Sequence, residues 1–221
     1  MKKHVIIVAG GKGLRMGGDL PKQFIPVADK PLLMHTIGVF YEWDKAIKII
    51  LVLPESHQSY WNMLCEELGF TVPHCVVNGG ETRFHSVLNG LNEVQEEGLV
   101  AVHDGVRPFV SPEVITACFE EAGRTGAAVP VIPMIDSLRH IEDGVSHPVD
   151  RTKYFAVQTP QVFSAALLHK AYSLPYTDLF TDDASVVEAY GESIRTVEGN
   201  RENIKITTSL DLIIAKAMLE K

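Results

Sequence analysis

The sequence predicts an α/β protein in which a mostly parallel sheet carries helices on both faces. Three observations lead to this fold class: short runs of β-branched residues recur along the chain, helical patterns separate them, and a glycine-rich loop directly follows the first run. Such alternation produces a mostly parallel sheet covered by helices. This arrangement is Rossmann-like. We expect residues 1–221 to form a single domain, because 46% of the chain is hydrophobic and no low-complexity linker divides it.

The elements are expected to alternate almost throughout the chain. The strands are predicted near residues 4–8, 48–53, 74–77, 99–103 and 127–132. The helices are predicted near residues 31–40, 58–68, 83–94 and 112–122. Ser111 followed by Pro112 is a helix start, and Thr208 and Asp211 stand in capping-box positions for a last helix.

Residues 134–155, "MIDSLRHIEDGVSHPVDRTKYF", break this alternation. They have the pattern of a hairpin with a turn at Glu142–Val145, and they place polar residues where the α/β pattern calls for a helix. The pattern fits an ordinary surface hairpin or a β-arm that projects from the sheet. A polar hairpin of this length gains little by standing alone in solvent, so we expect two arms to exchange about a twofold axis in a homodimer.

Composition excludes several classes of function. The net charge of −8 would repel a nucleic acid, whereas a small phosphorylated ligand needs only a local basic site. The apolar runs are far shorter than the roughly 20 residues that span a bilayer, and no signal-peptide region is seen, so we expect a cytoplasmic protein without a membrane partner. Cys65, Cys75 and Cys118 are scattered and odd in number, which argues against a disulfide framework or a structural zinc site.

The stretch "VAGGKGLRMGGDLPKQF", residues 8–24, indicates an anion-binding loop. It contains five glycines and the three basic residues Lys12, Arg15 and Lys22. Glycines after a strand let backbone N–H groups approach a phosphate, and the basic side chains add charge. The alternative is a glycine-rich surface turn with solvated charges. The loop predicts a cradle for a polyphosphate.

Two better-known phosphate loops do not fit. Met16 stands where the dinucleotide fingerprint requires its last glycine, which argues against a nicotinamide cofactor. Asp19 and Leu20 stand where a P-loop has Lys and Ser or Thr.

Polar residues follow the other predicted strands, at the edge where open α/β sheets bind ligands. Asp104 comes just after "LVAVH" and suits a hard cation, a ribose hydroxyl or simple turn capping. Arg107, before Pro108, suits a ligand or the carbonyls of its own loop. His103 is more often a packed residue than a catalyst. The sequence has neither a metal spacing such as HExxH nor a nucleophile beside a base.

Six motifs, in order, resemble those of the 2-C-methyl-D-erythritol 4-phosphate cytidylyltransferase family of the non-mevalonate isoprenoid pathway. They are "AGGKGLRMGGDLPKQF", "GGETRFHSV", "HDGVRPF", "VDRTKYFAVQTPQVF", "TDDASVVE" and "EGNRENIKIT". Each is moderately specific, and the set, which runs from Ile6 to the last helix, is highly specific.

The resemblance implies roles for individual residues. Arg15, Lys22 and Lys205 would be the catalytic cations on the triphosphate. Nucleotide-binding residues would be Ala9, Gly10, Gly11, Gly13, Gly80, Glu81, Ser86, Asp104 and Gly105, with Asp104 also near Mg²⁺ or another divalent cation. The methylerythritol phosphate would be bound across a dimer by Asp136, Ser137, Arg151, Thr159 and Arg107.

The chain departs from the family pattern at a few positions. Ser137 replaces a usual Thr and keeps its hydroxyl, Glu81 replaces a frequent Asp, and Gly105 and Val106 replace a frequent Ala-Ala. For Glu81 we therefore expect contacts through the backbone.

The expected substrates are CTP and a polyol phosphate, and the products are 4-diphosphocytidyl-2-C-methyl-D-erythritol and pyrophosphate. The phosphate nucleophile is already an anion near neutral pH, so no general base is needed. "HDGVRPF" leaves open a ribitol 5-phosphate cytidylyltransferase, against which "PVDRTKYF" and "TDDAS" argue. A non-catalytic nucleotide sensor is the other alternative, against which the presence of Lys22 and Lys205 argues.

Overall fold

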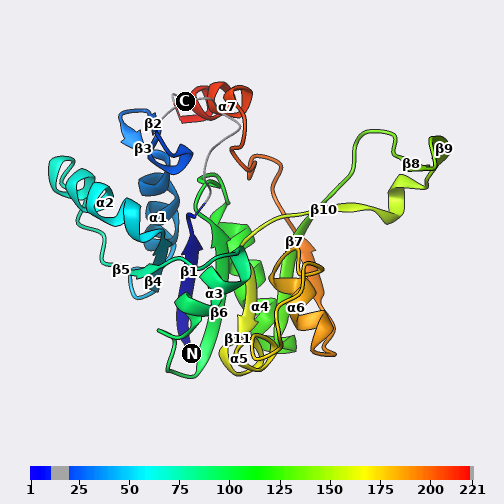
Figure 1. Ribbon diagram of the computed structural model, residues 1–221, viewed down its shortest axis with the longest axis horizontal. Coiled ribbons are helices and arrows are strands. Elements are labelled where there is room, and N and C mark those ends of the chain that lie inside the picture. Colours follow the sequence, from blue (N-terminus) through cyan, green and yellow to red (C-terminus); the bar gives the residue numbers. More distant parts are fainter. Residues whose placement is uncertain (11–19, 220–221) are drawn as a thin grey trace.

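The computed structural model describes residues 1–10 and 20–219. Its centre is an eight-stranded sheet in the order β10-β7-β11-β6-β1-β4-β5, with β12 paired to β7 (Figure 1). The strands are β1 (Lys2–Val8), β4 (Lys48–Leu53), β5 (Cys75–Asn78), β6 (Gly98–Asp104), β7 (Ala127–Pro133), β10 (Phe155–Val157), β11 (Gln161–Ser164) and β12 (Arg195–Glu198). The five strands expected from the sequence are all present.

The sheet is parallel through β6, β1, β4 and β5. On the other side β11 runs antiparallel to both β6 and β7, and β10 runs antiparallel to β7. The prediction of a mostly parallel sheet is confirmed, with β10 and β11 as its antiparallel members.

Helices cover both faces because neighbouring side chains on each strand point to opposite sides. The helices are α1 (Leu32–Trp43), α2 (Glu55–Glu67), α3 (Arg83–Leu91), α4 (Pro112–Thr125), α5 (Ala165–Ala171), α6 (Asp183–Ala189) and α7 (Ser209–Leu219). Val5 and Ile7 of β1 belong to a core with α1, α2 and α4, whereas Ile6 belongs to a second core with α3, α5 and α6. The expected helices are present, and the sequence did not predict the short helices α5 and α6.

The predicted helix starts are confirmed in detail. Ser111 Oγ accepts a hydrogen bond from Val114 N at 3.3 Å, and Pro112 follows as the first residue of α4. At α7 the two caps are reciprocal: Thr208 Oγ1 accepts from Asp211 N at 3.2 Å, and Asp211 Oδ2 accepts from Thr208 N at 2.7 Å. These bonds satisfy N–H groups that have no partner within a helix.

The arm leaves the sheet between β7 and β10 and carries a hairpin of β8 (Arg139–Glu142) and β9 (Val145–Pro148). Asp143 and Gly144 both have positive φ, 49° and 78°, as a two-residue hairpin turn requires. Figure 1 shows the arm extending well away from the main body, which confirms the projection predicted for residues 134–155. Ile141 and Val145, at its tip, are 70% and 56% exposed.

Four smaller elements belong to the described part of the fold. A short helical turn, η2 (Lys22–Phe24), precedes the hairpin of β2 (Pro26–Val27) and β3 (Lys30–Pro31), and η3 (Arg151–Lys153) lies in the arm. Within the described ranges, no helix is long and apolar enough to cross a membrane.

Candidate functional site

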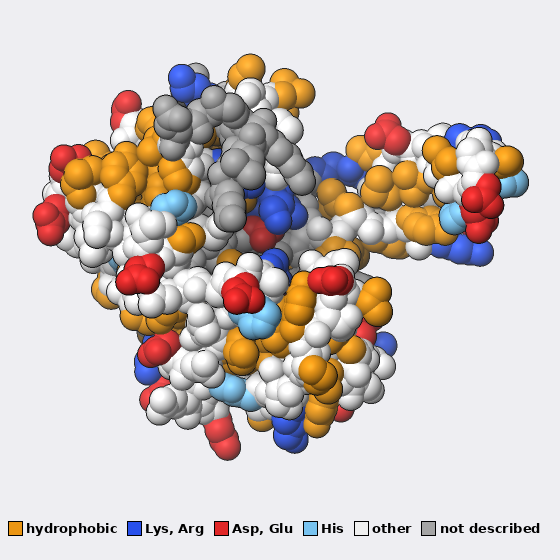
Figure 2. Space-filling view, in the orientation of Figure 1, with side chains coloured by type: hydrophobic (Ala, Val, Ile, Leu, Met, Phe, Trp, Pro, Cys, Tyr) orange, Lys and Arg blue, Asp and Glu red, His pale blue; other side chains and the backbone are white. Residues whose placement is uncertain are grey.

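A pocket of about 540 Å³ lies at the carboxyl ends of the parallel strands. Eight of the sequence-predicted residues line it: Ala9, Gly10, Lys22, Gly80, Glu81, Ser86, Asp104 and Lys205. Figure 2 shows a hollow in the middle of the molecule, with both basic and acidic side chains inside it. Gly11, Gly13 and Arg15 lie outside the described residues.

Strand register brings the loops of the pocket together. Val8 at the end of β1 pairs with Asp104 at the end of β6 and with Val52 near the end of β4. Gly105 N donates to Val8 O at 2.9 Å, and Ala9 N donates to Val52 O at 3.0 Å. Strands β1, β4 and β6 therefore end at the same edge of the sheet, and the segments that follow them form the floor of the pocket.

Asp104 is the central carboxylate of the pocket. Its Oδ2 lies 3.1 Å from Lys205 Nζ and accepts a hydrogen bond from Arg107 Nε at 3.0 Å. Burial alone would raise the pKa of Asp104, but Lys205, Arg83 and Arg107 outweigh this effect and hold its pKa well below the ordinary value. Asp104 is therefore ionised, and the structure brings it into contact with Lys205, a second residue that the sequence analysis named.

The donor set suits a divalent cation that arrives with a nucleotide. In the described part of the chain, no group of three or more His, Cys, Asp or Glu residues could hold a metal ion. Mg²⁺ commonly takes one or two carboxylates and completes its shell with phosphate and water oxygens. The ionised Asp104 fits that pattern, with triphosphate oxygens as the remaining ligands.

Arg107 and Thr159 bind protein groups, and neither lines the pocket. Arg107 reaches past Asp104 to donate from NH1 to Asn203 O at 2.7 Å, which ties the loop after β6 to the segment before Lys205. Thr159 Oγ1 accepts from Asp104 N at 3.1 Å and lies 3.0 Å from His103 Nδ1. In this chain both residues hold Asp104 in place, and the direct substrate contact implied by the resemblance stays a prediction.

His103 is a packed, neutral residue, as the sequence indicated. It is fully buried, and desolvation lowers its pKa to about 4. Its Nε2 lies 3.0 Å from Arg107 O, which can only accept, so Nε2 carries the proton and Nδ1 accepts from Thr159. The hydrogen bonds run in one direction, from Asp104 N through Thr159 and His103 to Arg107 O.

The loop expected to read the base is held in one shape. Gly80 N donates to Ser86 Oγ at 3.0 Å, and Ser86 is 5% exposed. A Cβ on Gly80 would lie 2.4 Å from His85 Cβ, so only glycine fits here. Because Ser86 Oγ accepts from Gly80, its own proton remains available to a ligand acceptor. Glu81 is exposed at the pocket edge.

Lys22 is the first residue of the short helical turn η2, and it lines the pocket. The next residue anchors this turn: Gln23 Nε2 donates to Ala9 O at 2.9 Å, and Gln23 is 1% exposed. Sequence reasoning did not single out Gln23. Its place in "PKQF", between a basic residue and an aromatic residue of the core, was the available signal.

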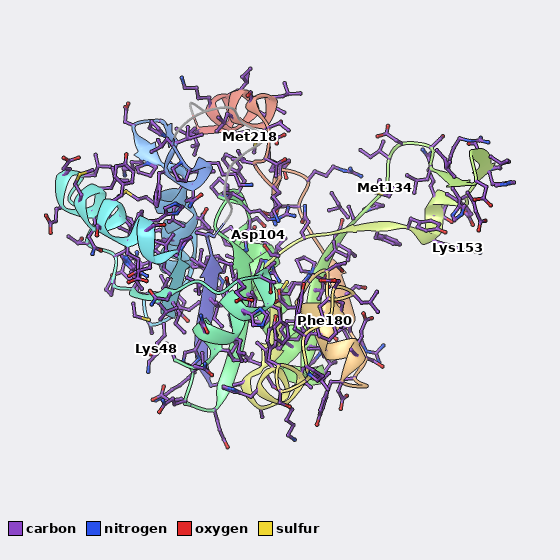
Figure 3. All side chains as sticks on the ribbon, viewed as in Figure 1. Lys48, Asp104, Met134, Lys153, Phe180 and Met218 are labelled. Atoms are coloured by element: carbon purple, nitrogen blue, oxygen red, sulfur yellow. The ribbon has the colours of Figure 1, made fainter. Side chains whose placement is uncertain are left out.

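The arm residues lie apart from the pocket of their own chain. Asp136, Ser137 and Arg151 are exposed, and none of them lines the pocket. Arg151 NH1 donates to Ile135 O within the arm. In Figure 3, Met134 and Lys153 mark an arm that points away from Asp104. Within one chain, these arm residues therefore lie apart from the predicted nucleotide-binding residues that line the pocket.

This fold and this glycine-lined, cation-bearing pocket define a nucleotidyltransferase. The model of the 2-C-methyl-D-erythritol 4-phosphate cytidylyltransferase family matches residues 3–221, and the chain belongs to that family. The prediction drawn from the six motifs is thereby confirmed, and the family match favours it over the ribitol and sensor alternatives.

Similar proteins agree over the whole length. The chain is 59% identical to the 2-C-methyl-D-erythritol 4-phosphate cytidylyltransferase of Bacteroides thetaiotaomicron, over 99% of this chain and 100% of that protein. It is 52% identical to the 2-C-methyl-D-erythritol 4-phosphate cytidylyltransferase of Porphyromonas gingivalis, over 99% of this chain and 98% of that protein. Its structure resembles the Thermus thermophilus enzyme with a TM-score of 0.79 at 33% identity, covering 100% of both chains. It also resembles the 4-diphosphocytidyl-2C-methyl-D-erythritol synthase of Anaerococcus prevotii, with a TM-score of 0.83 at 28% identity, covering 100% of this chain and 99% of that chain.

Proposed function

We propose that this pocket joins CTP to 2-C-methyl-D-erythritol 4-phosphate. An oxygen of the polyol phosphate attacks the α-phosphorus of CTP, the bond from that phosphorus to the β-phosphate oxygen breaks, and pyrophosphate leaves. The observation that carries the proposal is the contact of Lys205 with Asp104 in the pocket that Lys22 and the Gly80–Ser86 loop also line. The family match supports the same reaction.

The charges on both substrates decide what the protein must supply. A phosphate monoester is mostly a dianion near neutral pH, so it needs no base, but it must approach a polyanionic nucleotide. Catalysis then depends on placing the two phosphates in line and on fixed cations that neutralise charge in the transition state. Lys22 and Lys205 are such cations, and the resemblance adds Arg15.

The base is recognised by the Gly80–Ser86 loop. The free proton of Ser86 suits an acceptor on cytosine, and the rigid loop leaves little room for adjustment. Uracil reverses the donor and acceptor pattern on the edge that distinguishes the two pyrimidines. A site with fixed polar groups rejects such an analogue because buried groups remain unpaired.

Mg²⁺ is the proposed metal, held by Asp104 and the phosphates of CTP. When bound, it would neutralise charge on the triphosphate and so assist departure of pyrophosphate.

The proposed active form is a homodimer in which the arm of one subunit completes the pocket of the other. Two observations support it: the arm carries Asp136, Ser137 and Arg151 away from its own pocket, and it exposes apolar side chains such as Ile135 and Phe155, which are 61% and 52% exposed. An isolated hairpin with exposed apolar residues gains stability by packing on a second copy. Because CTP is a cytoplasmic nucleotide, the proposal places the enzyme in the cytoplasm.

Substrate turnover tests the proposed function. Purified protein with CTP and Mg²⁺ is expected to release pyrophosphate with methylerythritol phosphate and to release at least a hundredfold less with ribitol 5-phosphate, on the order of the selectivity a site with fixed polar contacts achieves. Equal turnover of ribitol phosphate would instead support the alternative enzyme. Binding of CTP without pyrophosphate release from either acceptor would support the sensor.

A further inference from the structure

A buried chain of hydrogen bonds runs from α5 through α6 to the wall of the pocket. Tyr172 donates its hydroxyl to Asp183 Oδ1 at 2.6 Å. Asp183 then accepts from both terminal nitrogens of Arg83, at 2.9 Å and 2.6 Å. Asp183 is 0% exposed and Tyr172 is 3% exposed, whereas Arg83 lines the pocket. A fully buried carboxylate therefore fixes the orientation of an arginine at the pocket wall.

The start of α6 is built to hold this carboxylate in place. Asp182 caps the helix by accepting from Ser185 N at 2.9 Å. Gln161 of β11 donates to Asp182 Oδ2 at 2.8 Å and accepts from Ala184 N at 2.9 Å. These bonds fix the first turn of α6 to the sheet, with the Asp183 side chain turned inward.

Stability alone gives little reason for this ion pair. A buried pair recovers the cost of removing two charges from water only with good geometry, and apolar residues of the same size often stabilise a fold at least as well. What the pair adds is direction, because two parallel hydrogen bonds fix the plane of the guanidinium. That plane lies at the wall of the nucleotide pocket.

The same connection fixes the turn that reads the base. Arg83 is the first residue of α3, directly after its cap Thr82, and Ser86 lies three positions further on the same turn. Phe84 stacks on Tyr172 with ring centroids 4.6 Å apart, and Phe180, labelled in Figure 3, stacks on Phe84 at 5.6 Å. Arg83 and Phe84 thus attach the first turn of α3 to α5 and α6. A shift of Arg83 would move Ser86 and, through it, Gly80.

We propose that Tyr172, Asp183 and Arg83 position the nucleotide half of the pocket. Asp183 orients Arg83, and the pair holds the first turn of α3 where the Gly80–Ser86 loop meets the base of CTP. All three are positioning residues that act through that loop. The inference rests on the proposed function in one respect, that the ligand is CTP. Asp183 and Tyr172 affect CTP binding through Arg83 and make no contact with CTP themselves.

Three substitutions that change the polar groups and keep most of each side chain test the proposal: Asp183→Asn, Arg83→Lys and Tyr172→Phe. Calorimetric titration with CTP gives Kd, and steady-state kinetics give KM for each substrate and the preference for CTP over UTP. Asp183→Asn and Arg83→Lys are each expected to weaken CTP binding by about tenfold, the scale of one charge-assisted hydrogen bond. KM for methylerythritol phosphate is expected to stay unchanged, and the preference for CTP over UTP to fall. Tyr172→Phe keeps the ring stack and is expected to show a smaller change in the same direction.

A double variant and a matched control separate positioning from general loss of stability. If Asp183 acts through Arg83, the double variant Asp183→Asn/Arg83→Lys binds CTP no more weakly than the weaker single variant. Thr116→Val serves as the control, since it removes a hydrogen bond from Trp43 Nε1 on the other face of the sheet. It is expected to lower the unfolding temperature and to leave the Kd for CTP unchanged.

Two results would overturn the inference while the unaltered protein binds CTP. One is a Kd for CTP and a CTP preference that stay unchanged in Asp183→Asn and Arg83→Lys. The other is an equal rise of KM for both substrates that follows the loss of unfolding temperature. Failure of the unaltered protein to bind CTP would be a different result, and it would overturn the proposed function itself.

Discussion

Lys205 Nζ lies 3.1 Å from Asp104 Oδ2, and the lysine side chain is 44% exposed while that of the aspartate is 11% exposed. The lysine therefore approaches a buried carboxylate from the solvent side of the pocket. Arg107 holds the same carboxylate from within the protein. Because Arg107 also pairs with Asp104, a move of Lys205 toward a phosphate would not leave the carboxylate unpaired, which fits the role proposed for Lys205.

The first prediction concerns the two pocket lysines. Lys205→Ala and Lys22→Ala are each expected to lower kcat by a factor on the order of 10²–10³, because each removes a fixed cation from a developing charge. Folding, followed by circular dichroism, is expected to persist. Lys45→Ala, which removes a surface ammonium 55% exposed, is the control with normal turnover. Near-normal kcat for Lys22→Ala would contradict its assignment.

The second prediction concerns the base. Ser86→Ala removes the hydroxyl that accepts from Gly80, so the ratio of kcat/KM for CTP to that for UTP is expected to fall by about tenfold or more. Competition between the two nucleotides for pyrophosphate release measures the ratio. Ser173→Ala, at an exposed serine after α5, is the matched control. An unchanged ratio in Ser86→Ala would show that another part of the pocket selects cytosine.

The third prediction concerns the shared site. Arg151→Ala and Lys22→Ala homodimers are each expected to be nearly inactive. Refolded together, half of the dimers are mixed and each mixed dimer has one intact site, so about a quarter of all sites should recover. Recovery of pyrophosphate release in the mixture would place Arg151 and Lys22 on different chains. A mixture as inactive as its parents, with mixed dimers verified by mass, would place both in one chain.

The fourth prediction concerns acid. Burial first, and then Lys48, lower the pKa of His4 from its ordinary value of 6.5, and His4 is 2% exposed. The unfolded chain therefore takes up a proton at His4 at a higher pH than the folded chain does. The stability that neutral His4 contributes is present above pH 6.5 and is lost as the pH falls toward the lowered pKa. Urea unfolding between about pH 7.5 and 5 is expected to show a smaller decline in the free energy of unfolding for His4→Phe than for the unaltered protein. An identical decline would exclude His4 as a source of acid sensitivity.

Local patterns predicted the local features of the fold. The caps at Ser111 and Thr208 depend on residues three positions apart, and the Asp143–Gly144 turn depends on adjacent ones, so all were visible in the sequence. The strands β10, β11 and β12 were not predicted. Each is only three or four residues long and is stabilised by pairing with a distant strand, which leaves no periodic signal in the chain itself.

The site divides in the same way. Lys22, Asp104 and Lys205 could be assigned because they belong to recognisable motifs, and the structure brings them to one pocket. The residues that hold these side chains in position could not be assigned from the sequence. Arg83 and Asp183 are far apart in the sequence, and the roles of Thr159 and Asn203 follow from which hydrogen bonds close in three dimensions. Charge and residue type indicate what a side chain can do, but burial decides which partner it meets.

The attachment of the arm has a consequence for how specificity can change. Both ends of the arm are strands of one sheet, since Pro133 at the end of β7 pairs with Phe155 at the start of β10. The protrusion is thus closed at its base, and its length or tip can vary without a change in the spacing of the strands beneath it. If the arm binds the polyol phosphate as proposed, the acceptor site is a separate segment from the nucleotide pocket. Related enzymes would then change their phosphate acceptor by substitutions within the arm, while the residues of the nucleotide pocket stay the same.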